Sequence, residues 1–435
     1  PTYLCAMRQL LRNPAGIASL ILLLQILLLI LRPGLAGNWL SPLLVWVPVL
    51  YALYFTLRWK AWKTDIALRN LGSTRLLQWG AFGLILLISA LVFRSYDSTN
   101  AMKSDVIPTV RILGERLLGG QPVYVTITEF GYILPPTYLP MHWLPFVPVL
   151  HLPVDLRIWA LLLFFLLSTP ALYWLASRQS GRNASLLTLL APALLVALYL
   201  LGQRDDAGYS VEWLYAAYYL LLVYGLMKEN AWICALALVC ILLSRFSLVL
   251  WLPVLPVWFW MKKGWKPVAI AAGIVITGIV LIYILPFLSR FPESFGNAQA
   301  YYTQGALMEW DGQAWQKPDD HPYQISRGLG MAWWFYRLYP GELAERIYAL
   351  KLVHAGGAIL LGLLFVFFQL RQTFSQVPAG VFLLGSLHAY LWYFYSFIQV
   401  PYPYLFIVPL MVSIAWVALL YAWQAKTETP GNQNR

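Results

Sequence analysis

Charge is scarce in this chain of 435 residues: Asp, Glu, Lys and Arg make up 11% of it, and 60% of its residues are apolar. A soluble globular domain carries about 25% charged residues. The composition therefore excludes a disordered chain, a fibrous repeat and an ordinary soluble enzyme. The charge that is present is mainly basic, with a formal net charge of +12, which in a soluble protein would suggest a nucleic-acid partner.

Cysteine and histidine are also few, with three and five residues respectively. Cys234 and Cys240 lie off one helical face, so we expect buried, inert thiols and no disulfide framework. The sequence has no Walker A loop, HExxH motif, GxSxG motif or Cys/His cluster, and so ATP hydrolysis, zinc proteolysis and serine hydrolysis lack support. We expect no metal site and no cofactor, and a divalent cation remains an open alternative.

Long uncharged runs are what the chain has in abundance. An α-helix needs about 20 residues to cross about 30 Å of hydrocarbon. Runs of that length cover 15–31, 39–57, 76–93, 158–177, 184–202, 267–289 and 352–370, and 372–425 has room for two more. Together with shorter segments they predict an all-α, polytopic helical membrane protein of about 12 transmembrane segments.

The basic residues concentrate in alternate loops. They lie in 58–75, 178–182 and 262–266, whereas the short turns 33–38 and 397–401 contain no Lys or Arg. Basic residues in short loops mark the cytoplasmic side of a membrane protein. We therefore expect cytoplasmic termini, membrane lipids as partners and no nucleic-acid partner.

This topology divides the chain into five regions. The predicted regions are a two-span N-terminal segment 1–75, a membrane core 76–289 with a first outer loop 94–138, a second outer loop region 290–345, C-terminal spans 346–425 and a polar cytoplasmic tail 426–435. Within the first outer loop, Pro108 and an apolar stripe predict a short amphipathic helix over 106–118, which Gly119 and Gly120 end.

Two apolar segments allow alternative topologies. Residues 138–152 contain three prolines and precede Pro153, so we favour a short or re-entrant segment over a full span, which would invert the turns that follow. Residues 231–261 lie between two basic positions, Lys228 and Lys262, and contain Arg245 at their centre. Two short helices that meet at an outward tip with Arg245 place both Lys228 and Lys262 on the cytoplasmic side.

Three ionisable side chains on the predicted outer side are candidates for chemistry. Asp97 and Asp105 stand eight residues apart, and a carboxylate here could act as a general base. Asp is also a preferred N-cap, so Asp105 could instead cap the helix that follows it. Arg245 could bind a phosphate bidentately, or it could pair with an acid such as Asp205, Asp206 or Glu212.

Several segments, in this order, resemble a known family. Residues 104–124 contain Asp105, a helical stretch and Gly120-Gln-Pro-Val-Tyr124, and Tyr132-Ile-Leu-Pro-Pro136 follows. Together they resemble the first outer loop of GT-C glycosyltransferases, in particular glycosyltransferase family 87, the polyprenyl-phosphate-mannose-dependent type. Leu201-Gly202-Gln203 and the segment 242–253 around Arg245 resemble later segments of the same family.

The resemblance implies a GT-C-like fold, Asp105 as the catalytic aspartate, Asp97 as an accessory acid and Arg245 as the cation that binds the lipid-linked phosphate. We add Arg204 as a second phosphate-binding candidate and expect substrate contacts from nearby side chains: Glu129, Tyr132, Gln203, Tyr124 and His142.

The implied activity is that of an inverting glycosyltransferase, a mannosyltransferase in the family it resembles. It would transfer a sugar from a polyprenyl-phosphate-linked donor to an extracytoplasmic glycan or glycolipid acceptor of the cell envelope. We expect a bacterial inner membrane with the active site on its periplasmic side. The alternatives are an O-antigen-type ligase or polymerase that uses a lipid-diphosphate donor, and a lipid-glycan transporter or flippase.

Overall fold

The computed structural model describes residues 14–31, 35–58, 71–179, 181–312, 322–327, 329–371 and 379–424. The predicted polar tail 426–435, most of the basic loop 58–75 and part of the second outer loop region lie outside these residues.

Among the residues just given, six helices are long and apolar enough to cross a membrane. They are α4 (Gly72–Phe93), α7 (Leu156–Ala176), α8 (Arg182–Gly202), α13 (Trp265–Ile279) with its continuation η3 (Val280–Leu288), α17 (Leu343–Leu370), and α19 (Ile407–Gln424) with the preceding η4 (Pro403–Phe406). Other helices accompany them: α2 (Pro14–Leu31), α3 (Leu35–Arg58), α10 (Trp213–Met227), α11 (Ala231–Leu242), α12 (Val254–Lys263) and α18 (Ala379–Ser396).

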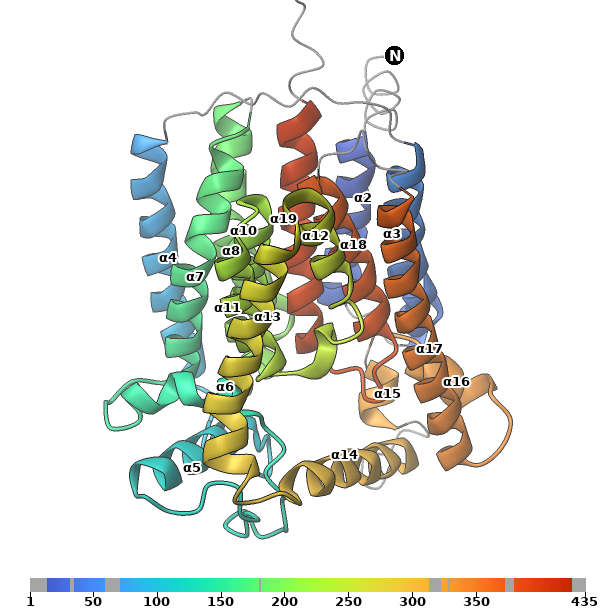
Figure 1. Cartoon of the computed structure of the whole chain (residues 1–435). Coiled ribbons are helices and arrows are strands. Elements are labelled where there is room, and N and C mark those ends of the chain that lie inside the picture. The colour runs from blue at the N-terminus through green and yellow to red at the C-terminus, as the bar shows by residue number, and fades with distance from the viewer. Residues whose placement is uncertain are drawn as a thin grey trace, which may run out of the picture.

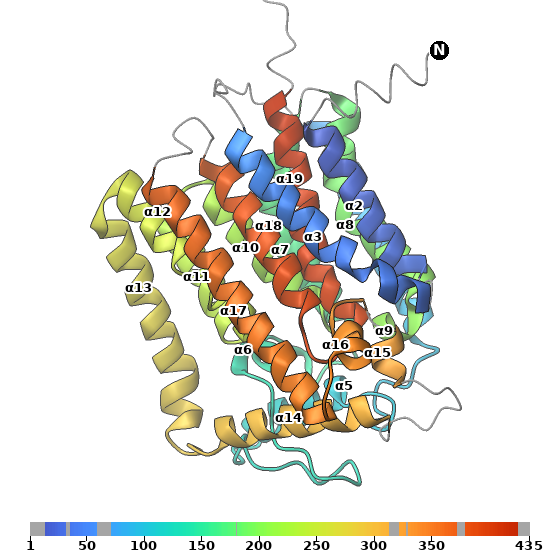
Figure 2. The same ribbon diagram turned by 90° about the vertical axis from the view of Figure 1, so that its right-hand side faces the viewer.

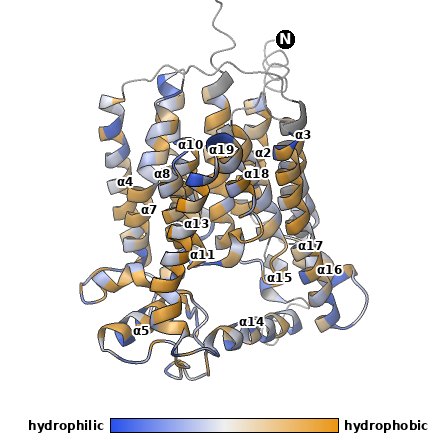
Figure 3. Cartoon of the chain, viewed as in Figure 1, coloured by the Kyte–Doolittle hydropathy of each residue, from blue (hydrophilic) through white to orange (hydrophobic). Residues whose placement is uncertain are grey.

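The helical fold class is confirmed over the described residues, which contain no strand and a single isolated bridge between Ile127 and Leu134. Figure 3 shows apolar residues concentrated along the long helices, as expected of helices that face hydrocarbon. The total of about 12 spans stays a prediction.

The segment 138–152 folds as two short helices rather than one long one. These are α6 (Pro140–Trp143) and η1 (Leu144–Val149), and neither has the length to cross a membrane. Pro145 and Pro148 remove backbone N–H donors and clash with a continuing helix, which explains the short turns. The full-span alternative is therefore wrong.

The segment 231–261 also breaks as predicted. Helix α11 ends at Leu242, η2 covers Phe246–Leu248, and α12 starts at Val254. Arg245 lies in the break with an extended backbone. The Met141 N–H donates to the Leu243 carbonyl at 2.8 Å and joins this break to α6.

Helix α17 begins earlier than its apolar run indicates. The run starts at Leu352, but the helix starts at Leu343, inside the predicted second outer loop region. Glu342 and Glu345 form a capping box there, in which each side chain accepts a hydrogen bond from the other residue's backbone. The cap, and not hydropathy, sets this boundary.

The two outer regions gather at one end of the helix bundle (Figure 1). Helices α5 (Val106–Leu118) and α6 lie there together with α14 (Ser294–Asp311), α15 (Tyr323–Arg327) and α16 (Ala332–Leu338). Figure 2 shows α14 running across this end of the bundle, roughly perpendicular to the long helices. We call this end the loop end.

Helix α10 is one of the enclosed elements of the bundle. It packs against α7 and α11, and most of its side chains are buried, including Tyr218 and Tyr219. Helix α13 is at the other extreme, with 6% of its apolar window buried, and it lies at the periphery in Figure 2. The residues at the loop-end terminus of α10 are thus held by packing on all sides.

Candidate functional site

Asp105 takes the N-cap position of α5, but its side chain makes no capping hydrogen bond. Its backbone is helical, with φ −85° and ψ −4°, whereas a capping Asp adopts the extended region, from which its oxygen can reach the next N–H groups. Asp105 therefore precedes the helix as predicted, but the prediction that its side chain caps the helix is wrong. The carboxylate is left half-buried and available for another partner.

That partner is Tyr132, whose hydroxyl lies 3.4 Å from Asp105 Oδ2 and donates to it. Burial raises the pKa of the Asp105 carboxyl, and the hydrogen bond from Tyr132 opposes the shift. A carboxylate with a raised pKa is a better proton acceptor than an ordinary surface Asp while it is still ionised near neutral pH. The first outer loop thus places a usable base beside a phenol.

Arg245 makes a two-pronged ion pair with Glu212, the residue that precedes α10. Its Nη1 lies 2.5 Å from Oε1 and its Nη2 lies 2.8 Å from Oε2. The Glu212 side chain is 2% exposed and that of Arg245 is 25% exposed. Of the alternatives, pairing with Glu212 is confirmed, and the guanidinium does not stand as an uncompensated cation.

Aromatic rings connect this ion pair to α6. The Arg245 guanidinium lies over the Tyr215 ring, 4.5 Å from its centroid. The His142 ring is 4.9 Å from the Tyr215 ring and stacks on Tyr138 at 3.8 Å. A continuous row of side chains therefore runs from the end of the first outer loop to the break between α11 and α12.

Two further tyrosines lie in the region between Asp105 and Arg245. Tyr302 of α14 and Tyr404 of η4 each lie within electrostatic range of both side chains. Residue Tyr302 is 48% exposed, so this region is not closed off by the protein. We call the assembled set the outer polar cluster: Asp105, Tyr132, Tyr138, His142, Glu212, Tyr215, Arg245, Tyr302 and Tyr404.

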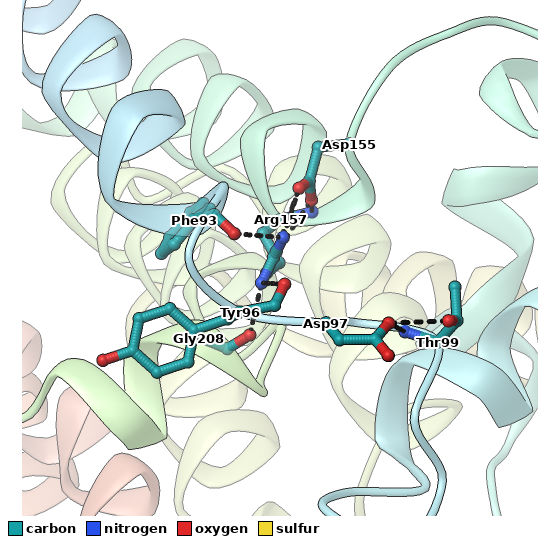
Figure 4. Close-up of polar contacts among 7 residues, drawn as sticks. All are labelled: Phe93, Tyr96, Asp97, Thr99, Asp155, Arg157 and Gly208. Atoms are coloured by element: carbon teal, nitrogen blue, oxygen red, sulfur yellow. Dashed lines mark hydrogen bonds and ion pairs between the residues drawn. The ribbon is translucent and has the colours of Figure 1, made fainter.

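Asp97 and Glu129 do not join the outer polar cluster. Asp97 is exposed and accepts hydrogen bonds from the Thr99 N–H at 3.0 Å and the Thr99 hydroxyl at 2.6 Å (Figure 4). These bonds lower the pKa of Asp97. Glu129 is also exposed and pairs with Arg116 at 3.1 Å. Both carboxylates hold local turns of the first outer loop.

Gln203, Tyr124 and Arg204 take structural or peripheral positions. Gln203 is 2% exposed and donates to the Leu29 carbonyl at 2.5 Å, which ties the end of α8 to α2. Tyr124 is buried, and its hydroxyl donates to the Tyr138 carbonyl at 2.8 Å. Arg204 is exposed and donates from Nε to the carbonyl of Leu200, one helical turn back.

A second arginine at the loop end, not singled out in the sequence, anchors the first outer loop. Arg157 is 3% exposed and pairs with Asp155, which also caps α7. Figure 4 shows its guanidinium between α7 and two other segments: it donates to the carbonyls of Gly208 at 2.6 Å, Phe93 at 3.0 Å and Tyr96 at 3.3 Å. We call Arg157, Asp155 and these three carbonyls the Arg157 clamp.

A lysine near the outer polar cluster makes no ion pair within the described residues. Lys351 of α17 donates from Nζ to the Thr303 hydroxyl at 3.0 Å, and Thr303 follows Tyr302 on α14. Its neighbours Tyr348 and Leu352 are 63% and 54% exposed, so this part of α17 faces the surroundings of the bundle. A positive charge without an acidic partner is therefore available where α14 meets α17.

Sequence reasoning missed Tyr138, Tyr215, Tyr302 and Tyr404, because 27 tyrosines are spread over the chain and none of these four lies in a distinctive motif. No group of three His, Cys, Asp or Glu side chains that could hold a metal ion occurs in the described part of the chain. Both described cysteines are free thiols, as expected. No protein family, no curated protein and no solved structure matches this chain.

Proposed function

We propose that this protein is an integral-membrane, inverting glycosyltransferase that transfers a sugar from a polyprenyl-phosphate donor to a glycan or glycolipid acceptor at the outer polar cluster. The observation that carries the proposal is that Asp105 and Arg245, far apart in the sequence, each lie within electrostatic range of the same two tyrosines, Tyr302 and Tyr404. The Asp105 carboxylate makes no capping hydrogen bond to α5, which supports a role as general base.

In the proposed reaction, Asp105 accepts the proton of an acceptor hydroxyl as the hydroxyl oxygen attacks the anomeric carbon. A new carbon–oxygen bond forms, and the bond from the anomeric carbon to the phosphate oxygen breaks. Polyprenyl phosphate leaves with the bonding electron pair, and attack from the opposite face inverts the anomeric centre. The proton on Asp105 then passes to water, which restores the base.

Lys351 supports the phosphate part of this proposal. The leaving group carries negative charge, which a cation without an acidic partner stabilises. The exposed side chains of Tyr348 and Leu352 beside Lys351 suit the approach of a lipid chain from the membrane.

The side of the membrane follows from the basic loops. Helix α7 runs away from the loop end, so Arg178 and Arg182 lie at the opposite end of the bundle. With the basic end in the cytoplasm, we propose that the outer polar cluster faces the periplasm of a bacterial inner membrane.

The test compares Asp105→Asn with Asp97→Asn, the same substitution in the same loop. In proteoliposomes with polyprenyl-phosphate mannose and an envelope glycan fraction as acceptor, we expect Asp105→Asn to lower transfer by roughly 10²- to 10⁴-fold. Asp97→Asn should keep near wild-type transfer, because that carboxylate only holds a turn with Thr99.

Full activity of Asp105→Asn would remove the assigned base. A parallel reaction with a polyprenyl-diphosphate-linked glycan identifies the alternative class: transfer from that donor alone would favour a ligase or polymerase. Equal losses in both variants would mean that the loop, and not one carboxylate, is required.

A further inference from the structure

We propose that Glu212, Arg245, Tyr215 and His142 form a subsite for the hydroxyl groups of the donor sugar ring, and that this subsite does not bind the phosphate. The inference rests on the proposed function and specifies which part of the donor meets which part of the outer polar cluster. We call these four residues the sugar subsite.

The first observation is a pair of buried polar atoms without partners. Within the part of the chain that the structure describes, the Tyr215 hydroxyl and His142 Nε2 make no hydrogen bond, and each residue is 2% exposed. Such atoms have lost their hydrogen bonds to water without replacing them, which is costly, and most buried polar groups are therefore paired. Both lie in the row of rings that ends at Arg245. Two such atoms on rings whose centroids are 4.9 Å apart indicate a place that a polar ligand completes.

The second observation is the charge of the subsite. The ion pair between Arg245 and Glu212 has no net charge, and neither Tyr215 nor His142 brings a fixed positive charge. A phosphate diester offers only acceptor atoms and a negative charge, so Glu212 would repel it. A sugar hydroxyl both donates and accepts, and therefore matches a carboxylate, a guanidinium, a phenol and an imidazole at once.

The third observation is that the positive charge lies elsewhere. Lys351 has no acidic partner among the described residues and is joined to α14 through Thr303. Thr303 follows Tyr302, which is within electrostatic range of Tyr215 and Arg245. A donor with its phosphate toward Lys351 can thus direct its sugar toward the sugar subsite.

Tyr215→Phe tests this assignment because it removes one hydroxyl and leaves the ring under Arg245. That hydroxyl has no hydrogen-bond partner among the described residues. If Tyr215 has only a structural role, Tyr215→Phe should therefore leave the melting temperature unchanged or higher and ligand binding unchanged. Tyr218→Phe is the matched control: Tyr218 is buried on the same helix, and its hydroxyl donates to the Met141 carbonyl at 3.1 Å.

Binding is measured on the full chain in nanodiscs, without acceptor, for polyprenyl-phosphate mannose, for polyprenyl phosphate and for methyl mannoside. We expect Tyr215→Phe to weaken binding of the two mannosides by about 5- to 15-fold, to leave binding of polyprenyl phosphate unchanged, and to keep the melting temperature at or above that of the wild type. Tyr218→Phe should lower the melting temperature and bind all three ligands like the wild type.

Unchanged mannoside binding in Tyr215→Phe would overturn the sugar subsite, and so would a wild-type protein that binds neither mannoside. An equal loss for polyprenyl phosphate would assign the hydroxyl to the phosphate and also overturn it. Because binding is read without transfer, a protein that shows the expected pattern but no transfer activity would keep the sugar subsite while the proposed function fails.

Discussion

Arg157 and Arg245 lie at the same end of the bundle, and each is paired with one carboxylate, yet their surroundings differ. Every nitrogen of the Arg157 guanidinium donates to Asp155 or to a backbone carbonyl, and the side chain is 3% exposed. Arg245 is 25% exposed, and two polar atoms near it, the Tyr215 hydroxyl and His142 Nε2, have no hydrogen-bond partner among the described residues. The first arrangement is closed and the second is open to a ligand.

This difference shows that burial of a cation near a membrane does not by itself identify a ligand site. A buried ionisable group is costly and needs a reason, and both arginines satisfy that condition. What separates them is whether the protein supplies all the hydrogen-bond partners. In the Arg157 clamp it does, so the clamp joins segments; around Arg245 it does not, so a substrate can.

The largest effect on stability is expected when the Arg157 clamp, the closed arrangement, is disrupted. Arg157→Met leaves the buried carbonyl of Gly208 without its donor, removes one of the two donors to the Phe93 carbonyl, and leaves Asp155 without its partner. We expect unfolding at lower temperature, with a loss of about 3–5 kcal/mol in the free energy of unfolding. Thermal denaturation in detergent measures it.

Arg111→Met is the control for this variant, because Arg111 makes an exposed pair with Glu115 at 3.7 Å. We expect Arg111→Met to lower the free energy of unfolding by less than about 1 kcal/mol. Equal stability of the two variants would mean that the Arg157 clamp does not hold the first outer loop.

A smaller effect on stability is expected at Arg245, because its partner Glu212 can be neutralised in the same variant. Arg245→Met takes away the guanidinium that opposes the burial-driven rise in the pKa of Glu212, so the carboxyl becomes protonated near neutral pH instead of remaining a stranded charge. The double variant Arg245→Met, Glu212→Gln should melt close to the wild type and lose transfer activity.

The equivalent double variant at the closed site gives the contrast. Arg157→Met with Asp155→Asn still leaves the buried Gly208 carbonyl without its donor, so its melting temperature should stay low. If both double variants recover stability, or if neither does, the distinction between a closed and an open arginine is wrong. Transfer by the Arg245 and Glu212 double variant would also contradict the role of the pair.

The smallest effect is a shift in pH dependence that concerns the proposed base. Transfer needs ionised Asp105, so the rate falls as the pH drops through its pKa. Tyr132→Phe removes the hydrogen bond that lowers this pKa, so the pKa rises and the acidic limb of kcat/KM moves to higher pH. The rate at high pH should change little.

Tyr96→Phe is the matched control, because the Tyr96 hydroxyl lies 3.2 Å from a different carboxylate, that of Asp205. Its pH profile should overlay that of the wild type. An unmoved acidic limb in Tyr132→Phe would mean that Asp105 does not set the pH dependence of transfer.

Much of the helix arrangement could be predicted from local sequence. The uncharged runs correspond to α2, α3, α4, α7 and α8, and the amphipathic stretch after Asp105 corresponds to α5 over its full predicted range. Prolines predicted the short helices of 138–152, and the flanking lysines predicted the break at Arg245. These features depend on residues close in sequence, so no tertiary information was needed.

The site was predicted less completely. Asp105, Tyr132, His142 and Arg245 come together, whereas Gln203 and Tyr124 are used in packing and Asp97 in a turn. A polar side chain beside a predicted outer loop can meet either a backbone carbonyl or a ligand. Local sequence does not distinguish the two, because the partner comes from another helix.

The sequence by itself determined that the chain is a bundle of apolar helices with its polar additions outside, because the preference of a segment for hydrocarbon is the sum of its own side chains. Only the tertiary structure decided that Glu212 neutralises Arg245, that Asp105 faces Tyr132 instead of its own helix, and that Tyr302 and Tyr404 lie within electrostatic range of both Asp105 and Arg245. The physical reason is that hydrogen bonds and ion pairs act over a few ångströms, and chain folding alone brings such distant residues that close.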